Sequence, residues 1–231
     1  MILTNLIKEN PPRPSGWTPY QLQVGDLELR VAHRGKGGTP LLLVTGIGAH
    51  IDMWSPLERV LNGREVIAFD APGTGGSQSL VWPRRMDGLA EIVRDLLDTL
   101  GHERVDVLGV SFGGALAQEF ARRYPDRVRR LVLCSTSAGF VCVPPKPLPL
   151  LLVMSPARYY HPALFRLIMP RLAGGRTARD PSRLDEQREA RLSRPPNLLG
   201  YAFQLYAASG WTSAHYLHRL SLPTLVIAGD D

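Results

Sequence analysis

The stretch that decides the fold is Arg104–Tyr124, RVDVLGVSFGGALAQEFARRY. Its first part, Val105–Val110, is a β-branched run typical of a buried strand, and an amphipathic helical pattern follows directly. Between the two lies Gly-Val-Ser-Phe-Gly at 109–113, a Gly-x-Ser-x-Gly motif at a strand-to-helix turn. Because such a turn strains the serine backbone, its neighbours must be small. The pattern therefore predicts an exposed nucleophilic serine, Ser111, rather than a serine in an ordinary glycine-rich turn.

A second glycine-flanked loop follows an apolar strand predicted at 41–45. Gly46-Ile47-Gly48 allows backbone N–H groups to approach a reacting atom, so we expect it to form half of an oxyanion hole. The alternative for this loop is an ordinary strand-to-helix turn. Asp70, at the end of the strand predicted at 66–69, is followed by Pro-Gly-Thr-Gly, which favours a carboxylate that holds loop amides over a catalytic one.

Strands and helices alternate along the first half of the chain. Apolar strands are predicted at 41–45, 66–69, 105–110 and 130–134, with helical patterns at 53–61, at 87–100 and after Ser111. Strand–helix alternation of this kind predicts an α/β fold with a parallel, doubly wound sheet. Residues 20–33 alternate around Gly25-Asp26 and predict a β-hairpin. The polar, proline-rich residues 1–18 are expected to be a loose N-terminal arm.

The pattern changes after the strand at 130–134. We expect an α/β core at 19–136, a helical lid insertion at 137–220, and a core strand within 221–231. Apolar stretches of the insertion, such as those at 164–169 and 201–206, could wall a hydrophobic pocket or simply pack the insertion against the sheet.

Composition narrows the function classes. The chain has 231 residues, 44% hydrophobic and 21% charged, as expected for one globular domain. Its net charge of +6 comes mostly from scattered arginines, without a basic run interleaved with aromatics, so no nucleic-acid partner is expected. The spacing of Cys134 and Cys142 is typical neither of a metal site nor of a disulfide framework, which favours a cytoplasmic location. We expect no metal and no cofactor. No signal peptide or membrane span is predicted; the most apolar run, at 148–154, is too short to cross a bilayer.

These motifs together resemble the α/β-hydrolase family. The similar segments are the loop at 45–48, DAPGTGGS at 70–77 and the Gly-x-Ser-x-Gly turn, and the likeness covers residue 20 to the end. Within the family the chain is most similar to intracellular medium-chain poly(3-hydroxyalkanoate) depolymerases, through GIGA (46–49), SAGFVCVPPKP (137–147), MSPARYY (154–160) and GWTSAHYLHRL (210–220). Phe112 departs from the tryptophan expected after the nucleophile in many such depolymerases.

The resemblance implies serine-ester hydrolysis. Ser111 would attack the ester carbonyl, and the backbone N–H groups of Ile47 and Phe112 would hold the oxyanion. The substrate would be a hydrophobic ester or polyester, and the protein could associate with the surface of polyester granules in the cytoplasm.

The sequence does not supply the catalytic base that serine-ester hydrolysis needs. Triad order in this fold is Ser, then Asp or Glu, then His. All six histidines, at 33, 50, 102, 161, 215 and 218, precede the strand predicted near 224–229, and Asp231 is only a weak candidate for the acid. His50, His215 and His218 are interpreted as packing or loop residues. The resemblance implies that a final strand, a histidine loop and a helix are missing, and that the chain is truncated with little or no turnover.

Two other functions stay open at this stage. The same fold could act as a general carboxylesterase or a C–C bond hydrolase. The missing triad histidine favours a third hypothesis for this polypeptide, a non-catalytic protein that binds acyl ligands.

Overall fold

A computed structural model describes residues 18–58, 60–61, 63–139, 147–173 and 179–229. Its centre is a seven-stranded sheet with the order β1-β2-β4-β3-β5-β6-β7. The strands are β1 (Tyr20–Val24), β2 (Leu27–Arg34), β3 (Leu41–Val44), β4 (Val66–Phe69), β5 (Val105–Val110), β6 (Val128–Cys134) and β7 (Thr224–Ile227). The pairs from β4 through β7 are parallel, whereas the β1–β2 hairpin and the β2–β4 pair are antiparallel. The predicted hairpin and parallel sheet are therefore confirmed.

Period-two alternation in the central strands builds two apolar cores, one on each face of the sheet. On one face Leu42 and Val44 join a large core with α2 (Met86–Thr99) and α3 (Phe112–Arg123). On the other, Leu41 and Leu43 join a smaller core with a short 3₁₀ helix, η1 (Ile51–Trp54), and α1 (Ser55–Glu58). The central strands β3 and β4 are buried at every position, as a sheet covered on both faces requires.

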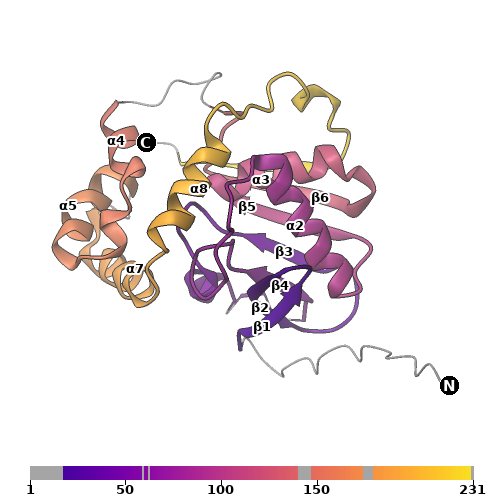
Figure 1. Ribbon diagram of the computed structural model, residues 1–231, viewed down its shortest axis with the longest axis horizontal. Helices are drawn as coiled ribbons and strands as arrows, with labels where there is room; N and C mark the ends of the chain where they lie inside the picture. The colour runs from indigo at the N-terminus through magenta and orange to yellow at the C-terminus, as the bar shows by residue number, and fades with distance from the viewer. Residues whose placement is uncertain (1–17, 59, 62, 140–146, 174–178, 230–231) are drawn as a thin grey trace.

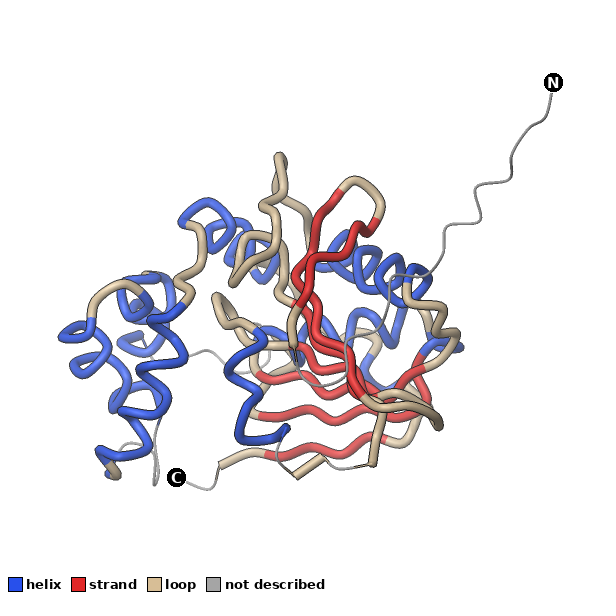
Figure 2. Tube along the Cα trace, turned by 90° about the horizontal axis from the view of Figure 1, so that it is seen from below, coloured by secondary structure: helices blue, strands red, loops and turns tan. Residues whose placement is uncertain are grey.

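Helices fill the insertion between β6 and β7. The described ones are α4 (Pro147–Met154), η3 (Pro156–Tyr159), α5 (Pro162–Ala173), α7 (Pro181–Ser193) and α8 (Leu198–Ala208). Figure 1 shows α4, α5 and α7 grouped at one end of the molecule, with α8 between this group and the sheet, and Figure 2 shows the group to one side of the strands. The remaining short helices are η2 (Pro125–Arg127) and η4 (Leu217–Arg219).

Some boundaries differ from the sequence-based prediction. The single helix expected at 53–61 is divided into η1 and α1, because the chain enters it through a 3₁₀ turn and Pro56 occupies the first turn of α1. β7 lies at the edge of the sheet, and its apolar residues Leu225, Val226 and Ile227 are exposed. Residues 1–17 of the arm predicted at 1–18, and the candidate acid Asp231, lie outside the described residues.

Candidate active site

Ser111 lies at the sharp turn between β5 and α3, as predicted. Its backbone has φ +53° and ψ −118°, a left-handed conformation that only a well-supported turn can impose on a serine. The turn is held from both sides: Ser111 N–H donates to Cys134 O at 3.0 Å, and Thr136 Oγ1 donates to Ser111 O at 2.7 Å. Ser111 is exposed and caps α3, so its hydroxyl lies at the positive end of the helix dipole.

Glycines beside Ser111 are required by close approach of neighbouring backbone. A Cβ at Gly113 would overlap the carbonyl oxygens of Val44 and Thr45, because α3 begins directly against the end of β3. A Cβ at Gly109 would overlap the backbone of Gly113. These approaches explain why both flanking positions of the motif are glycine.

The loop after β3 lies beside the nucleophile. A Cβ built at Gly46 would be 3.6 Å from Ser111 Cβ, so loop and turn are in van der Waals range. Ile47 follows directly, and Phe112 is the first residue of α3. Neither the Ile47 nor the Phe112 backbone N–H donates a hydrogen bond within the part of the chain that the structure describes. Both donors are therefore free to bind an oxyanion.

Two side chains of the insertion hold this loop. Tyr159 donates its hydroxyl to Ile47 O at 2.6 Å, and Gln204 Oε1 accepts from Gly48 N at 2.8 Å. Gly48 has φ +68°, and a Cβ there would lie 2.7 Å from the ring of Tyr201, so only glycine fits both the conformation and the contact. Sequence reasoning missed these contacts, which we call the loop clamp (Tyr159 and Gln204). The one signal for it was Gln204, a lone amide in the otherwise apolar α8.

A cavity of about 370 Å³ opens at Ser111. It brings together the three residues predicted to do the chemistry, Ser111, Ile47 and Phe112. Its other apolar walls come from α3 and from the residues that follow β6: Ala115, Val153, Leu205, Ala208 and Trp211. The cavity suits an apolar acyl group next to a polar reacting centre.

Behind the loop, Asp70 acts as the loop-holding carboxylate that the sequence predicted. It accepts hydrogen bonds from Ile51 N at 2.6 Å and Gly76 N at 3.0 Å and pairs with Arg30. Arg30 also binds Asp52 at 2.8 Å. Contact with His50, together with Arg30, holds the pKa of the Asp52 carboxyl well below its usual range. These charges brace the loop and lie outside the cavity lining.

Glu119, buried on α3, holds the segment that closes the cavity. It accepts hydrogen bonds from Trp211 Nε1 at 3.2 Å and from the Tyr216 hydroxyl at 3.0 Å, and it pairs with Arg122. Burial acts to raise its pKa, but the Arg122, Trp211 and Tyr216 donors outweigh burial and keep the pKa of Glu119 below its usual value. Trp211 is thus fixed as a wall of the cavity.

No histidine reaches this cavity, although all six lie in the described part of the chain. His50 is buried with its Nε2 2.7 Å from Ala190 O and its Nδ1 3.2 Å from Asp52, which confirms its interpretation as a packing residue. His215 packs edge-on against Tyr216. His33 and His102 lie at the far end of the sheet. Ser111 and the Ile47 and Phe112 N–H donors thus lie at one cavity without a histidine next to them.

The fold and the turn at Ser111 define the class of protein to which this chain belongs. The α/β-hydrolase fold family matches residues 39–231, and the chain belongs to this family. A poly(3-hydroxyalkanoate) depolymerase of Ectopseudomonas oleovorans is 47% identical over 194 residues, which cover 84% of this chain and 68% of that protein. The chain is thus a hydrolase of this fold that resembles that depolymerase.

Other relatives show how widely the framework is used. A 2-hydroxy-6-oxononadienedioate/2-hydroxy-6-oxononatrienedioate hydrolase of Burkholderia vietnamiensis is 33% identical, over 88% of this chain and 75% of that protein. Among solved structures, an esterase from Thermogutta terrifontis matches with a TM-score of 0.73 and 31% identity, over 92% of this chain and 80% of that one. The fold and esterase-type resemblance expected from the sequence are therefore confirmed.

Proposed function

We propose that this chain carries the nucleophile, oxyanion hole and acyl pocket of a serine ester hydrolase that acts on hydrophobic polyester. The observation that carries the proposal is the shared cavity. An exposed serine at a strained turn faces the same apolar space as two free N–H donors, those of Ile47 and Phe112. In this proposal residues 19–136 and 221–231 form the core and 137–220 the lid.

The chemistry follows from this arrangement. Ser111 Oγ forms a bond to the ester carbonyl carbon, and the oxygen takes the negative charge and accepts hydrogen bonds from the Ile47 and Phe112 N–H groups. Collapse of this intermediate breaks the bond between the carbonyl carbon and the alcohol oxygen, which takes up the proton that Ser111 has lost. The alcohol leaves, and water hydrolyses the remaining acyl-serine to the free acid and Ser111. One such donor typically lowers the barrier by about 2.7–4 kcal/mol. The Ser111 proton needs an acceptor, and no histidine of this sequence lies at the cavity, so we expect this chain to turn over esters slowly or not at all.

The polyester substrate is supported by apolar surface as well as by the related depolymerase. Besides the cavity walls, the insertion exposes many large apolar side chains: Leu148, Leu151, Met154, Leu164, Leu167, Leu198, Leu199 and Tyr206. Surface of this kind suits contact with a hydrophobic solid.

No described helix combines the length and apolar character needed to cross a membrane. We therefore propose that the protein is cytoplasmic and meets its substrate at a granule surface.

The second candidate function is binding of acyl ligands without turnover. The absence of a histidine at the cavity favours it for this polypeptide. The two candidates share the cavity and differ in the reactivity of Ser111.

Phosphonate labelling tests the proposal. The chain is incubated with a fluorophosphonate, with and without added imidazole, and the modified residue is located by peptide mass spectrometry. We expect a slow adduct on Ser111 that imidazole accelerates, because imidazole in solution can accept the proton, and no adduct in Ser111→Ala. An adduct on another residue, or none under either condition, would contradict the nucleophile assignment. Rapid labelling without imidazole would show that a base already present activates Ser111.

Granule binding tests the substrate separately. The chain should sediment with granules of medium-chain poly(3-hydroxyalkanoate), and Leu148→Ser/Leu151→Ser in α4 should weaken sedimentation several-fold. The control is Val81→Ser, which removes an apolar side chain outside the insertion that is at least as exposed as Leu148 and Leu151. Equal sedimentation of both variants would refute the role given to the insertion surface.

A further inference from the structure

A cluster of His33, Glu65 and His102 lies at the end of the sheet opposite Ser111. His33 is the next-to-last residue of β2, Glu65 directly precedes β4, and His102 lies in the turn between α2 and β5. β4 and β5 begin at this end, whereas Ser111 follows the end of β5. The cluster is therefore separate from the hydrolase site and independent of the proposed function.

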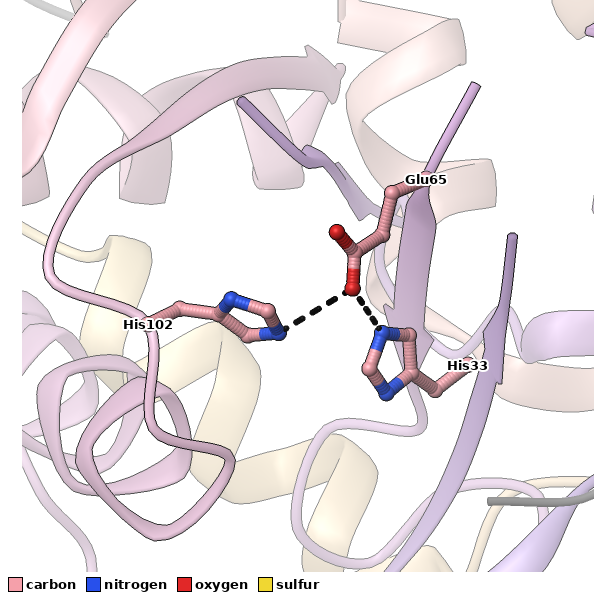
Figure 3. Close-up of side chains that lie close together, drawn as sticks. All are labelled: His33, Glu65 and His102. Atoms are coloured by element: carbon pink, nitrogen blue, oxygen red, sulfur yellow. Dashed lines mark hydrogen bonds and ion pairs between the residues drawn. The ribbon is translucent and has the colours of Figure 1, made fainter. Parts of the chain in front are cut away.

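The three side chains converge on one point. Figure 3 shows the Glu65 carboxylate aimed between the two imidazole rings. Its Oε1 is 2.7 Å from His33 Nε2 and 3.6 Å from His102 Nε2, and one ligand atom from each residue lies within 4.8 Å of the others. His33 and Glu65 are buried, whereas His102 is partly exposed. The two rings meet edge to face, with centroids 5.3 Å apart.

We propose that these three residues bind one divalent transition-metal ion, with Zn²⁺ as the best fit. Two imidazole nitrogens and a carboxylate oxygen form a ligand set that Zn²⁺ prefers, at bond lengths of about 2.0–2.2 Å. Tetrahedral bonds of that length place ligand atoms about 3.3 Å apart. The 2.7 Å pair has to open by about 0.6 Å and the 3.6 Å pair to close by about 0.3 Å. The two imidazole nitrogens lie within 4.8 Å of each other and have to reach the same spacing, which rotation of the side chains supplies. Water would supply the fourth ligand, next to His102, which is the least buried of the three residues.

The backbone holds the three ligands in place before any ion binds. His33 is paired with Ile67 in the β2–β4 ladder. Glu65 O accepts from Leu41 N at 2.8 Å, and His102 O accepts from Arg127 Nη2 at 2.8 Å. Ligands fixed on three separate elements favour a preorganised site. The bound ion would tie the antiparallel edge of the sheet to the α2–β5 turn, so its role is structural.

Metal titration of the whole, untagged chain tests this site without any need for turnover. We expect one equivalent of Zn²⁺ per chain after dialysis. Co²⁺ should give the visible absorption of a low-symmetry, nearly tetrahedral site. Because the ion binds the folded chain, Zn²⁺ at about 100 times its dissociation constant should raise the thermal midpoint by roughly 5–10 °C.

Variants separate this site from adventitious binding. His102→Gln should lower Zn²⁺ affinity at least tenfold, and Glu65→Gln should do so as well, since it keeps a hydrogen-bonding oxygen but loses the charge. His218→Gln, which removes an exposed histidine elsewhere, should bind Zn²⁺ like the unmodified chain. His102 is partly exposed, so its substitution leaves a folded chain to measure, and circular dichroism checks this. No retained Zn²⁺ in the unmodified chain, or equal affinity in His102→Gln and His218→Gln, would overturn the proposal.

Discussion

Replacing Gln204 by leucine tests whether the insertion supports the oxyanion loop. Leucine has nearly the same size but cannot accept the 2.8 Å hydrogen bond from Gly48 N. Gly48 and Gln204 are both buried, so the Gly48 N–H would lose its partner without gaining water. An unsatisfied buried N–H costs about 1–3 kcal/mol. Gln204 Nε2 itself has no partner among the described residues, and its removal offsets part of that loss. We therefore expect a net loss of about 1–2 kcal/mol.

Urea unfolding measures the loss, and the rate of phosphonate labelling at Ser111 measures its effect on the site. Because Ile47 precedes Gly48 directly, release of the loop should move the Ile47 N–H and slow labelling about tenfold or more. This is less than the roughly hundred- to thousand-fold cost of losing one oxyanion donor outright, because the N–H is displaced rather than removed. The matched control is Gln23→Leu, which removes only an exposed hydrogen bond to Gly25 O and should change stability by less than about 0.5 kcal/mol. Equal stability and equal labelling in Gln204→Leu and the unmodified chain would refute the supporting role.

Three further substitutions follow from the same geometry. Gly113→Ala should destabilise the chain by about 3 kcal/mol or more in urea unfolding, because its Cβ would overlap the Val44 carbonyl oxygen; a loss under about 1 kcal/mol would contradict this packing. Alanine is usually more stabilising than glycine, but at Ser111 this order of stability should reverse, because only glycine tolerates φ +53° without strain. Thermal unfolding should show Ser111→Gly to be about 1–2 kcal/mol more stable than Ser111→Ala. A more stable Ser111→Ala would show that the turn is relaxed. Glu119→Gln should lose about 1–3 kcal/mol at pH 7. Because folding lowers the pKa of Glu119, its contribution to the free energy of unfolding is present above pH 4.5, the ordinary pKa of a glutamate, and is lost as the pH falls below that value. The stabilities of Glu119→Gln and the unmodified chain should therefore converge below pH 4.5. A constant difference between them down to about pH 3 would refute the assignment.

The sequence predicted the framework because its signals are local. The runs that became β3 and β4 are apolar throughout, and the glycines around Ser111 mark a turn that few other residues could make. The position of Ile47 beside Ser111 followed from the parallel order of the strands, because consecutive strand ends meet at one edge of such a sheet.

The loop clamp and the histidine cluster could not be predicted in this way. Gln204 and Gly48 are 156 residues apart, and their contact depends on how α8 docks. Glu65 and His102 meet only because β4 and β5 start at the same edge of the sheet, and no fixed spacing marks them as partners. Contacts of this kind are set by tertiary packing, which local sequence patterns do not report.

The loop clamp also limits how this protein can diverge. Loops and insertions usually accept sequence change more readily than the scaffold, and new specificities arise there. In this chain Val153 and Leu205 line the cavity proposed to hold the acyl group, so exchange of these two residues would change the acyl chains that fit. Tyr159 and Gln204, from the same insertion, are tied to the loop that the reaction needs. Adaptation to a new substrate is therefore open at the first pair of positions. Replacing the second pair removes contacts to the backbone of residues 47 and 48, which no substitution at those two residues can restore.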